Sequence, residues 1–364
     1  MKIHFLCKRY YTNKDLLKDR FGRLFHLPVQ LSGLGADVSV TAIDYRSASI
    51  EKLTANGVVF QNIPATFALL PRLLFDLDRI VAAVAPDILV ASGDSHIGFV
   101  GKYIARRAGA RFVFDVYDYY PSFAGNRIPG FKAMFRSAVR NADLVLCASE
   151  PLRNLLSPLN RNTLLVQNGV DRELFRPIDK WDARARLGLE PIVPYVGYFG
   201  AITPTRGPLL IEACRRLRHE IPELRLLLAG PVKGVDLDKP GIIYHGVLPQ
   251  ESIPERIAAC DVVAVPYADD TFNRMSGACK IAEYLACERP VVATNVAGHA
   301  KFFGHTPFSV CNQDPEHMAA AIRGHLQEAA YAPFPEQLDW NGIGKVLHRF
   351  LLEFPPNLKS QSTK

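Results

Sequence analysis

The feature that most restricts how this chain can fold is the alternation of short apolar runs with amphipathic segments. Residues 37–43, 111–116 and 291–293 are rich in β-branched and other apolar side chains, as buried strands are. Segments such as 69–84 and 207–219 instead place apolar residues at helical spacing. Strands that alternate with helices in this way favour an α/β fold with parallel, doubly wound sheets.

Two such series follow one another, and 364 residues are enough for two hydrophobic cores. The first series predicts strands at 1–7, 37–43, 58–63, 87–91, 111–116, 144–148 and 164–166, with helices at 24–34, 69–84, 98–108 and 131–140. The second predicts strands at 192–198, 224–229, 242–245, 261–265 and 291–293, with helices at 207–219, 254–259 and 279–286. We therefore expect a first domain at 1–175, a second at 176–338 and a final helix at 339–357.

The charge and the cysteines restrict the partners and the compartment. A net charge of +7 suits nucleic acid, anionic lipid headgroups or phosphorylated small molecules. Nucleic acid is not expected as a partner, because no nucleic-acid-binding module is present. The seven cysteines are scattered without C-x-x-C spacing, which argues against a zinc site or a disulfide framework and predicts a cytoplasmic protein.

The N-terminal segment raises the question of membrane contact. Its short apolar stretch, 3–7, is interrupted by His4, and we do not expect a signal peptide. No apolar run is long enough to span a bilayer. The segment mixes cations with aromatic residues: Lys8, Arg9, Lys14, Lys18, Arg20 and Arg23 with Tyr10, Tyr11, Phe21 and Phe25. An ordinary solvated face is the first explanation of this mixture, and peripheral contact with the inner membrane surface is the alternative.

The stretch 275–295 combines a loop of small residues, a short helix and a buried strand. The loop at 276–278 consists of small residues and ends at Ala278, so a ligand can approach its backbone closely. Lys280 lies on the first turn of the helix, whose free amides attract anions, and Glu283 lies about one turn further on. A cation for phosphate beside a carboxylate for sugar hydroxyls suits a nucleoside diphosphate. The alternative is an ordinary surface ion pair.

A second loop, 198–207, follows a predicted strand and precedes a helix. The backbone at Gly200 can approach a phosphate, and Arg206 can bind one in bidentate fashion. An ordinary turn with a solvated arginine is the alternative. Ligands bind at the carboxyl ends of parallel strands, where the loops that carry Val247, Leu248 and Tyr267 also emerge.

Several motifs together resemble family four of the GT-B glycosyltransferases. The N-G-V-D at 168–171, followed by Phe175 and Pro177, resembles the end of that family's first domain. The loop from Gly200 to Gly207 resembles its G-x-x-x-x-x-K-G loop, with Arg206 in place of lysine. K-I-A-E-Y-L-A at 280–286 with P-V-V-A-T at 290–294 is similar to its nucleotide-binding segment, and D-V-V-A-V-P at 261–266 to the strand before it.

The resemblance implies a fold, a donor and roles for single residues. It implies two Rossmann-like domains that face each other across a cleft, with the C-terminal helix crossing back to the first. Arg206 and Lys280 would bind the donor diphosphate and stabilise the leaving group, and Glu283 would hold the ribose hydroxyls. Val247 and Leu248 would lie near the base, and no metal or other cofactor is expected. Met275 stands where the family often has a glutamate.

The first domain contributes candidates for the acceptor side. Asp118, in a Y-D segment similar to that of some exopolysaccharide-type transferases, is a candidate general base, with Asp115 behind it and Tyr117 beside it. Asp115 also suits a structural role as a turn cap. His96 is a second catalytic candidate. Gly22 and Arg23 should border the acceptor.

The sequence thus predicts a metal-independent glycosyltransferase that uses a nucleoside diphosphate sugar. The acceptor would be a saccharide or a lipid-linked saccharide in cell-surface polysaccharide synthesis. The resemblance implies retention of anomeric configuration, and the Asp118 loop leaves inversion open. A nucleotide-sugar epimerase and a non-catalytic nucleotide-sugar-binding protein are the alternatives. A dinucleotide dehydrogenase is disfavoured, since no G-x-G-x-x-G follows the first strand of either domain.

Overall fold

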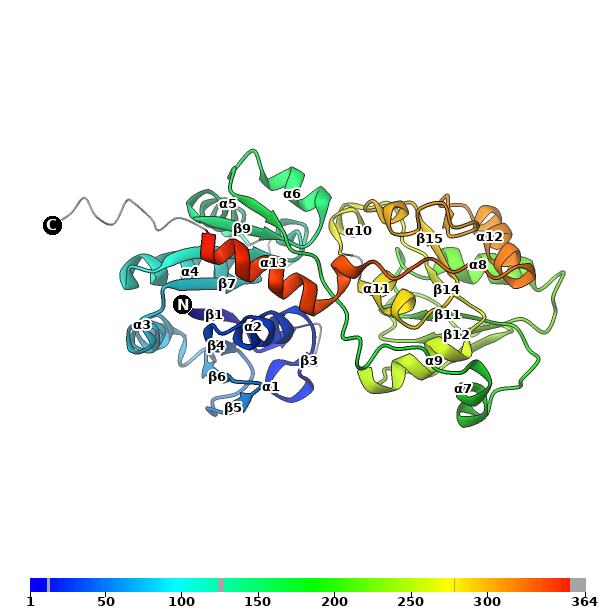
Figure 1. Cartoon of the computed structure of the whole chain (residues 1–364), viewed down its shortest axis with the longest axis horizontal. Helices are drawn as coiled ribbons and strands as arrows, with labels where there is room; N and C mark the ends of the chain where they lie inside the picture. The colour runs from blue at the N-terminus through cyan, green and yellow to red at the C-terminus, as the bar shows by residue number, and fades with distance from the viewer. Residues whose placement is uncertain (12–13, 124–127, 278, 354–364) are drawn as a thin grey trace. The chain divides into compact units, whose positions relative to one another are not determined.

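The computed structural model describes residues 1–11, 14–123, 128–277 and 279–353. The chain divides into two compact units, which Figure 1 shows with their helices and strands labelled. Unit 1 comprises Met1–Gly169, Met275–Gly277 and the C-terminal segment that begins at Trp340. Unit 2 comprises Val170–Arg274 and the segment that ends at Asp339. Each unit has its own core of buried hydrophobic side chains.

Unit 1 is built on a sheet in which eight strands of the described chain pair in the order β10-β9-β8-β7-β1-β4-β6-β5. All neighbouring pairs are parallel except β5 with β6. A short antiparallel hairpin, β2–β3, lies outside this sheet. The strands are β1 Lys2–Lys8, β2 Tyr10–Tyr11, β3 Lys14–Asp15, β4 Asp37–Asp44, β5 Lys52–Ala55, β6 Val58–Pro64, β7 Ile88–Ser92, β8 Arg111–Val116, β9 Leu144–Cys147 and β10 Thr163–Leu165.

Helices cover both faces of this sheet. They are α1 Leu16–Asp19, α2 Arg23–Gly33, α3 Leu73–Val84, α4 Ser95–Ala108, α5 Phe131–Asn141, α6 Glu150–Leu156 and α13 Trp340–Glu353. The α2 crossover moves toward β5, whereas the α3, α4 and α5 crossovers move toward β10. Because such crossovers are right-handed, α2 lies on one face and α3, α4 and α5 on the other. The helix α13 packs on α2 (Figure 1), as the expected return of the C-terminal helix to the first domain requires.

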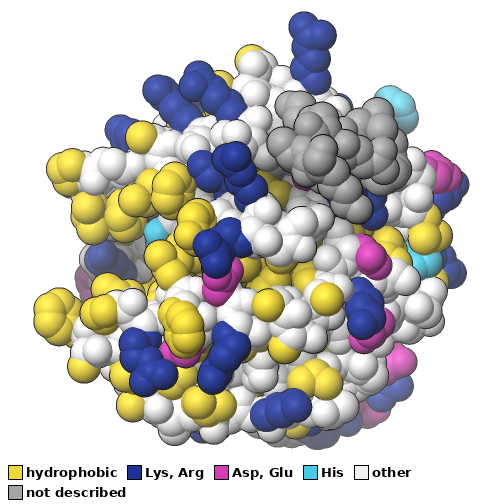
Figure 2. All heavy atoms as spheres, turned by 90° about the vertical axis from the view of Figure 1, so that its left-hand side faces the viewer, with side chains coloured by type: hydrophobic (Ala, Val, Ile, Leu, Met, Phe, Trp, Pro, Cys, Tyr) yellow, Lys and Arg dark blue, Asp and Glu magenta, His cyan; other side chains and the backbone are white. Residues whose placement is uncertain are grey.

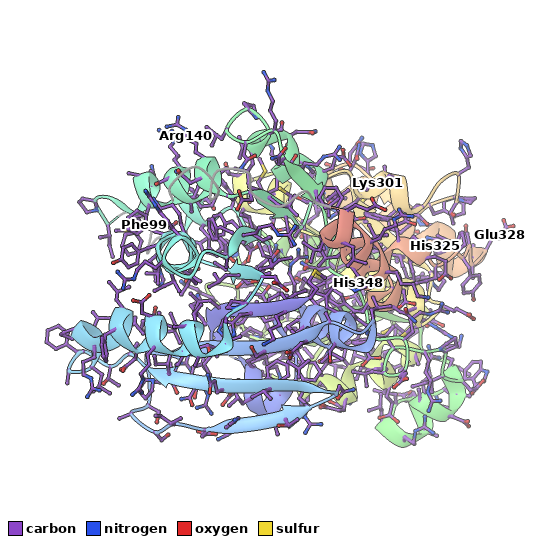
Figure 3. The ribbon with its side chains drawn as sticks, turned by 60° about the vertical axis from the view of Figure 1, so that its left-hand side comes forward. Phe99, Arg140, Lys301, His325, Glu328 and His348 are labelled. Atoms are coloured by element: carbon purple, nitrogen blue, oxygen red, sulfur yellow. The ribbon has the colours of Figure 1, made fainter. Side chains whose placement is uncertain are left out.

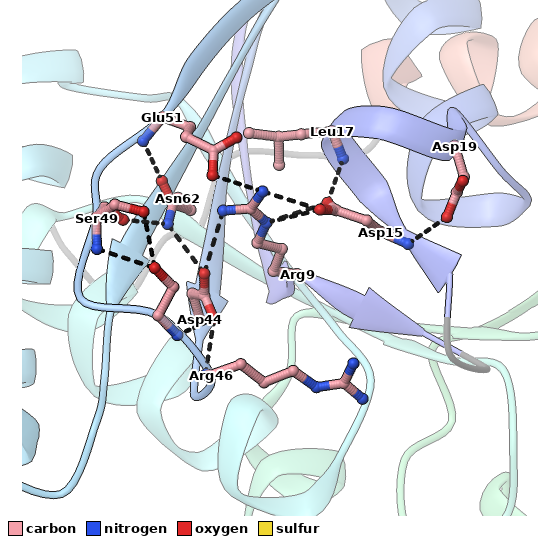
Figure 4. A network of polar contacts seen from close by, with 10 residues as sticks. Arg9, Asp15, Leu17, Asp19, Asp44, Arg46, Ser49, Glu51 and Asn62 are labelled. Atoms are coloured by element: carbon pink, nitrogen blue, oxygen red, sulfur yellow. Dashed lines mark hydrogen bonds and ion pairs between the residues drawn. The ribbon is translucent and has the colours of Figure 1, made fainter.

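A buried ion network holds the segment that follows β1 (Figure 4). The Arg9 guanidinium lies 2.9 Å from Asp15, 3.1 Å from Asp44 and 2.9 Å from Glu51. Arg9 is buried, and Arg23 and Phe25 from the same N-terminal region are buried as well. These side chains therefore do not form the membrane-facing surface that the mixture of cations and aromatic residues suggested.

Unit 2 repeats the design with a parallel sheet ordered β13-β12-β11-β14-β15-β16 among the residues that the structure describes. Its strands are β11 Tyr195–Phe199, β12 Arg225–Ala229, β13 Ile242–Tyr244, β14 Val262–Val265, β15 Val291–Thr294 and β16 Val310–Cys311. Its helices are α7 Lys180–Leu187, α8 Pro208–Leu217, α9 Ile253–Ala259, α11 Cys279–Ala286 and α12 Pro315–Gln327, and α10 Thr271–Met275 lies at its border. Both units are Rossmann-like, as expected.

Some elements differ from the prediction. The helix expected at 69–84 is a 3₁₀ turn, η1 Leu70–Arg72, followed by α3. The helices α1, α6, α7, α10 and α12 and the short strands β2, β3, β5 and β16 were not predicted. None of the helices that the structure describes combines the length and hydropathy that a bilayer-spanning segment requires.

Candidate functional site

The helix α11 presents a cation and a carboxylate at the carboxyl edge of the unit 2 sheet. Lys280 Nζ lies 2.8 Å from Glu283 Oε2. Burial alone would lower the pKa of Lys280, but the neighbouring Glu283 carboxylate more than offsets this effect, so the pKa lies above its ordinary value. The Lys280 ammonium therefore remains charged throughout the neutral range. Tyr284 ties the helix to β11, because its hydroxyl accepts a hydrogen bond of 3.0 Å from the Phe199 N–H.

The turns after β11 and β12 bring bare backbone next to this cation. A Cβ atom on Gly200 would lie 3.3 Å from Lys280 Cε, so the lysine stem runs over the glycine. A Cβ atom on Gly230 would lie 2.1 Å from the Gly200 carbonyl oxygen, and Gly230 has a φ of +133°. Only glycine suits a positive φ and so close an approach of two backbones.

Arg206 is held beside the same edge by aromatic rings and an amide. Its guanidinium carbon lies 4.1 Å from the ring centre of Tyr267 and 4.8 Å from that of Phe272. Its Nε donates a hydrogen bond of 2.7 Å to Asn273 Oδ1. Asn273 is fully buried, and its Nδ2 donates to the carbonyls of Thr205 and Ala268. The guanidinium is thus oriented by a rigid cradle before any ligand binds.

These groups meet where the sheet changes direction. The crossovers through α8 and α9 move to opposite sides, so the topological switch point lies between β11 and β14. Arg206 follows β11 and Tyr267 follows β14, and the two residues form an isolated backbone bridge. Lys280 lies over Gly200, in the same loop after β11 that carries Arg206, so both cations border this loop. Open α/β sheets bind their ligands at this point.

The remaining predicted donor residues lie on neighbouring loops. Val247 is 68% exposed on the loop after β13, and Leu248 is half-buried. That loop is tied to the turn after β12, since the Gly230 N–H donates to the Gly246 carbonyl at 2.8 Å. Ala278 lies outside the described residues.

The unit 1 sheet has a corresponding edge with a polar cluster. His96 Nε2 lies 2.9 Å from the Tyr45 hydroxyl, and Lys8 Nζ lies 2.5 Å from Asp94 Oδ2. Lys8 ends β1 and Asp94 follows β7, the two strands that flank the switch point of this sheet. Burial lowers the pKa of His96, so its imidazole is neutral near pH 7. Asp118 is half-buried on the loop after β8.

Three of the predicted acceptor-side residues are buried in the core of unit 1. Arg23 is 3% exposed and Asp115 is 0% exposed, and their charged groups lie 2.6 Å apart. Arg23 Nη1 also donates to the Val166 carbonyl at 2.5 Å. Tyr117 is buried too, and Gly22 is the residue before α2, with a φ of +67°. This placement indicates that Arg23 and Asp115 hold strands and loops together rather than contact an acceptor.

The sequence reasoning missed several residues that shape these edges. Asn273, which orients Arg206, lies in the unpredicted helix α10. Lys8, Tyr45 and Asp94 each end or directly follow a strand, and the rule that ligands bind at the carboxyl ends of strands could have found them. Within the described part of the chain, no three His, Cys, Asp or Glu side chains are grouped as a metal ion would need.

Comparison with known families and proteins agrees with this architecture. Residues 23–169 match the family described as glycosyl transferase 4-like domain, and residues 193–328 match glycosyl transferases group 1. The D-inositol 3-phosphate glycosyltransferase of Segniliparus rotundus is 35% identical over 201 residues, which cover 50% of this chain and 42% of that protein. The Mycobacterium marinum protein of the same name is 31% identical over 185 residues, which cover 46% and 38%. The chain thus spans less than half the length of these relatives.

Two solved structures share the fold over nearly the whole chain. Sucrose-phosphate synthase from Thermosynechococcus elongatus has a TM-score of 0.74 at 18% identity, covering 97% of this chain and 98% of that one. Anabaena Alr3699/HepE, in complex with UDP and glucose, has a TM-score of 0.73 at 18% identity, covering 97% and 99%. These likenesses show the fold, and the two family matches, which follow the two Rossmann-like units in order, show that the chain belongs to the family-four-like GT-B glycosyltransferases.

Proposed function

We propose that this protein transfers a sugar from a nucleoside diphosphate sugar to an acceptor hydroxyl. The observation that carries the proposal is the placement of Arg206 and Lys280 along one glycine-bounded loop at the switch point of the unit 2 sheet. Two cations beside bare glycine backbone suit a diphosphate, and Glu283 suits the ribose hydroxyls. Support also comes from HepE, a structural neighbour whose solved complex contains UDP and glucose.

The chemistry that these side chains supply is stabilisation of the leaving group. As the bond between the sugar and the diphosphate breaks, negative charge grows on the phosphate oxygens. Preorganised cations stabilise that charge without a reorganisation cost, and mutational losses of one such group reach about 3–4 kcal/mol. We propose that Arg206 and Lys280 do this without a metal ion and that the configuration is retained. Asp118 would act as the base if the reaction is inverting.

The acceptor side of the proposal concerns the polar edge of unit 1. The polar edge that carries His96 and Asp118 is where unit 1 would bind an acceptor. We propose a saccharide or a lipid-linked saccharide of a cell-surface polysaccharide, used at the cytoplasmic face of the membrane. The names of the matched relatives make D-inositol 3-phosphate the first soluble acceptor to test.

The test measures thermal stabilisation by UDP, GDP, ADP and TDP in the wild type and in Lys280→Ala. A nucleotide at 100 times its dissociation constant should stabilise by about 2.7 kcal/mol. We expect one nucleotide to stabilise the wild type and the control Lys239→Ala, which removes an exposed lysine of the same unit, but not Lys280→Ala. An equal response of Lys280→Ala and the wild type would refute the assigned site.

A second measurement separates transfer from the alternatives. The wild type is incubated with the matching nucleotide sugar, with and without acceptor, and the products are separated by chromatography and identified by NMR, which distinguishes epimers of equal mass. Release of nucleoside diphosphate together with a glycosylated acceptor supports the proposal. An epimerised nucleotide sugar formed without acceptor would instead identify an epimerase.

A further inference from the structure

The helices α4 and α5 form a strongly basic surface on unit 1. They pack side by side on the same face of the sheet. Neither helix contains Asp or Glu, and their cations are Lys102, Arg106, Arg107, Lys132, Arg136 and Arg140. All of these side chains are exposed except Lys102, which is half-buried. Arg140 extends outward from the end of α5 (Figure 3).

The neighbouring helix α3 cancels only part of this charge, because one of its two carboxylates pairs with a cation of α4. Its carboxylates, Asp76 and Asp78, are already paired with arginines: Asp76 lies 3.7 Å from Arg72, and Asp78 lies 2.7 Å from Arg107. The second pair links α3 to α4. Arg79 adds a further exposed cation on α3 itself. We call the exposed surface of α3, α4 and α5, together with residues 67–72, the basic face.

Large apolar side chains project from one border of the basic face. Phe67 is 94% exposed, Phe75 is 66% exposed, and Leu70 and Leu74 are about half exposed between them. All four lie within nine residues, just after the carboxyl end of β6. Figure 2 shows this side of unit 1, where hydrophobic side chains gather at the surface with Lys and Arg side chains among them. Contiguous exposed apolar side chains usually mark a surface that a partner covers.

We propose that the basic face binds an anionic lipid bilayer, with Phe67, Leu70, Leu74 and Phe75 entering the headgroup region. Cations beside an anionic membrane contribute about fivefold each to binding, and apolar side chains add the hydrophobic contribution that makes the contact specific for lipid. Nucleic acid would satisfy the cations but would leave Phe67 and Phe75 without an apolar layer. The surface differs from the N-terminal segment that the sequence suggested, where Arg9 and Arg23 are buried.

Binding to a bilayer through the basic face would also orient unit 1 for the proposed sugar transfer. The apolar border lies at the carboxyl edge of the sheet, the same edge that carries His96 and Asp118. A bilayer at this border would bring a lipid-linked acceptor to that edge. This last step rests on the proposed function, whereas binding to lipid does not.

The test is flotation of the full chain with vesicles of phosphatidylcholine and phosphatidylglycerol in a 7:3 ratio, against vesicles of phosphatidylcholine alone. We expect at least tenfold stronger binding to the anionic vesicles. The variants Lys132→Glu/Arg136→Glu and Phe67→Ser/Phe75→Ser should each weaken that binding at least tenfold. Because all four side chains are exposed, the variants should keep the wild-type melting temperature, which is measured in parallel.

Two control variants make comparable changes outside the basic face. One reverses two positive charges, and the other removes an exposed apolar side chain. The first control is Lys345→Glu/Arg349→Glu, which changes two exposed residues of α13, over the opposite face of the unit 1 sheet. The second control is Ile192→Ser, which changes a residue of unit 2 that is 91% exposed. Both controls should bind within twofold of the wild type.

The proposal is overturned if the wild type does not prefer anionic vesicles or if the controls lose binding equally. It is also overturned if a DNA duplex displaces the wild type from vesicles while Phe67→Ser/Phe75→Ser binds normally. Thermal stabilisation by the nucleotide is measured on the same variants. A variant that loses binding to vesicles but keeps this stabilisation shows that the lipid proposal and the proposed transfer activity are tested separately.

Discussion

Charged side chains in this protein act in two different settings, and burial separates them. Arg23 and Asp115 lie in the core of unit 1, where their charges are paired with each other. Lys280 keeps a quarter of its side chain accessible and lies next to exposed loops, as a ligand-binding cation must. A buried ion pair seldom stabilises a fold more than apolar residues would, but the loss of one partner is costly because it leaves an unpaired charge.

Asp115→Asn should therefore lower the free energy of unfolding by about 3–5 kcal/mol, because Arg23 would stay buried without its carboxylate. Urea denaturation at pH 7 measures the loss. The control is Asp78→Asn, which breaks the exposed pair with Arg107 and should cost no more than about 1 kcal/mol. Equal losses in the two variants would contradict the structural role of the buried pair.

Two buried imidazoles should make the fold sensitive to acid. Burial lowers the pKa of His4 to about 4, and that of His299 to about 4. In the unfolded chain a histidine titrates near 6.5, so below this pH the unfolded state binds the proton more strongly. Stability should therefore fall as the pH drops from about 6.5 to 4 and level off below that, with each group contributing about 3–4 kcal/mol in full.

His4→Asn tests this dependence. The difference in unfolding free energy between pH 7 and pH 4.5 should be smaller in the variant than in the wild type by about 2–3 kcal/mol. His299→Asn should reduce the difference by a similar amount, because burial lowers the pKa of His299 in the same way. An unchanged difference in His4→Asn would show that His4 is not held neutral by burial.

At the scale of elements, α4 packs unusually close to the sheet beneath it. A Cβ atom on Gly98 would lie 2.5 Å from the Phe114 ring, and one on Gly101 would lie 2.4 Å from Ala91 Cβ. Both contacts involve buried side chains of β7 and β8 that have little room to move. The close packing positions the start of α4, which carries His96, at the carboxyl edge of the sheet.

Gly98→Ala should destabilise unit 1 by about 1–3 kcal/mol, because the added methyl group overpacks a dense core. Gly33→Ala is the matched control. Gly33 is also helical, nothing lies within 4 Å of its Cβ position, and alanine there should stabilise by about 0.5–1 kcal/mol. In thermal melts, Gly98→Ala should lower the melting temperature and Gly33→Ala should raise it. Equal destabilisation by the two substitutions would contradict the packing argument.

The helix α12 shows which unpredicted elements carried a readable signal. It begins with Asp314 as N-cap, whose carboxylate accepts hydrogen bonds from the N–H groups of Glu316 and His317, and Pro315 occupies its first position. This start signal precedes buried apolar residues at helical spacing. The strand β16, with two residues, carried no such signal, since its pairing with β15 depends entirely on the sheet.

Asp314→Ala should cost about 1 kcal/mol, the usual contribution of a helix N-cap. The substitution Asp314→Asn keeps an acceptor at the cap and should retain most of the stability. Thermal denaturation compares the two variants. A loss as large in Asp314→Asn as in Asp314→Ala would show that the capping hydrogen bond is not the cause.

At the scale of the whole molecule, the C-terminal helix belongs to the core of the N-terminal unit. The Trp340 ring stacks on the His26 ring at a centroid distance of 5.3 Å, and a Cβ atom on Gly169 would lie 2.8 Å from the Trp340 ring. Leu347 and Leu351 are buried on the same helix. Unit 1 is therefore complete only when residues far apart in the chain have come together.

Trp340→Ala should destabilise unit 1 by about 3–5 kcal/mol through the cavity that it leaves. Leu210→Ala, in the core of unit 2, should do the same for the other unit. Because the two cores are separate, scanning calorimetry should show the two variants shifting different parts of the unfolding profile. Identical profiles in the two variants would show that the cores unfold as one cooperative unit.

The sequence by itself determined the α/β class, most strands and helices, and the Lys280–Glu283 spacing, because periodicity and helix geometry are local properties. The motifs at 168–171, 200–207 and 280–286 also identified the family. Only the tertiary structure decided that Arg23 is buried against Asp115, 92 residues away, and that Asn273 orients Arg206. It alone joined α3, α4 and α5 into the basic face. Such outcomes depend on which strands become neighbours, and pairing between distant segments leaves no periodic signal in the chain.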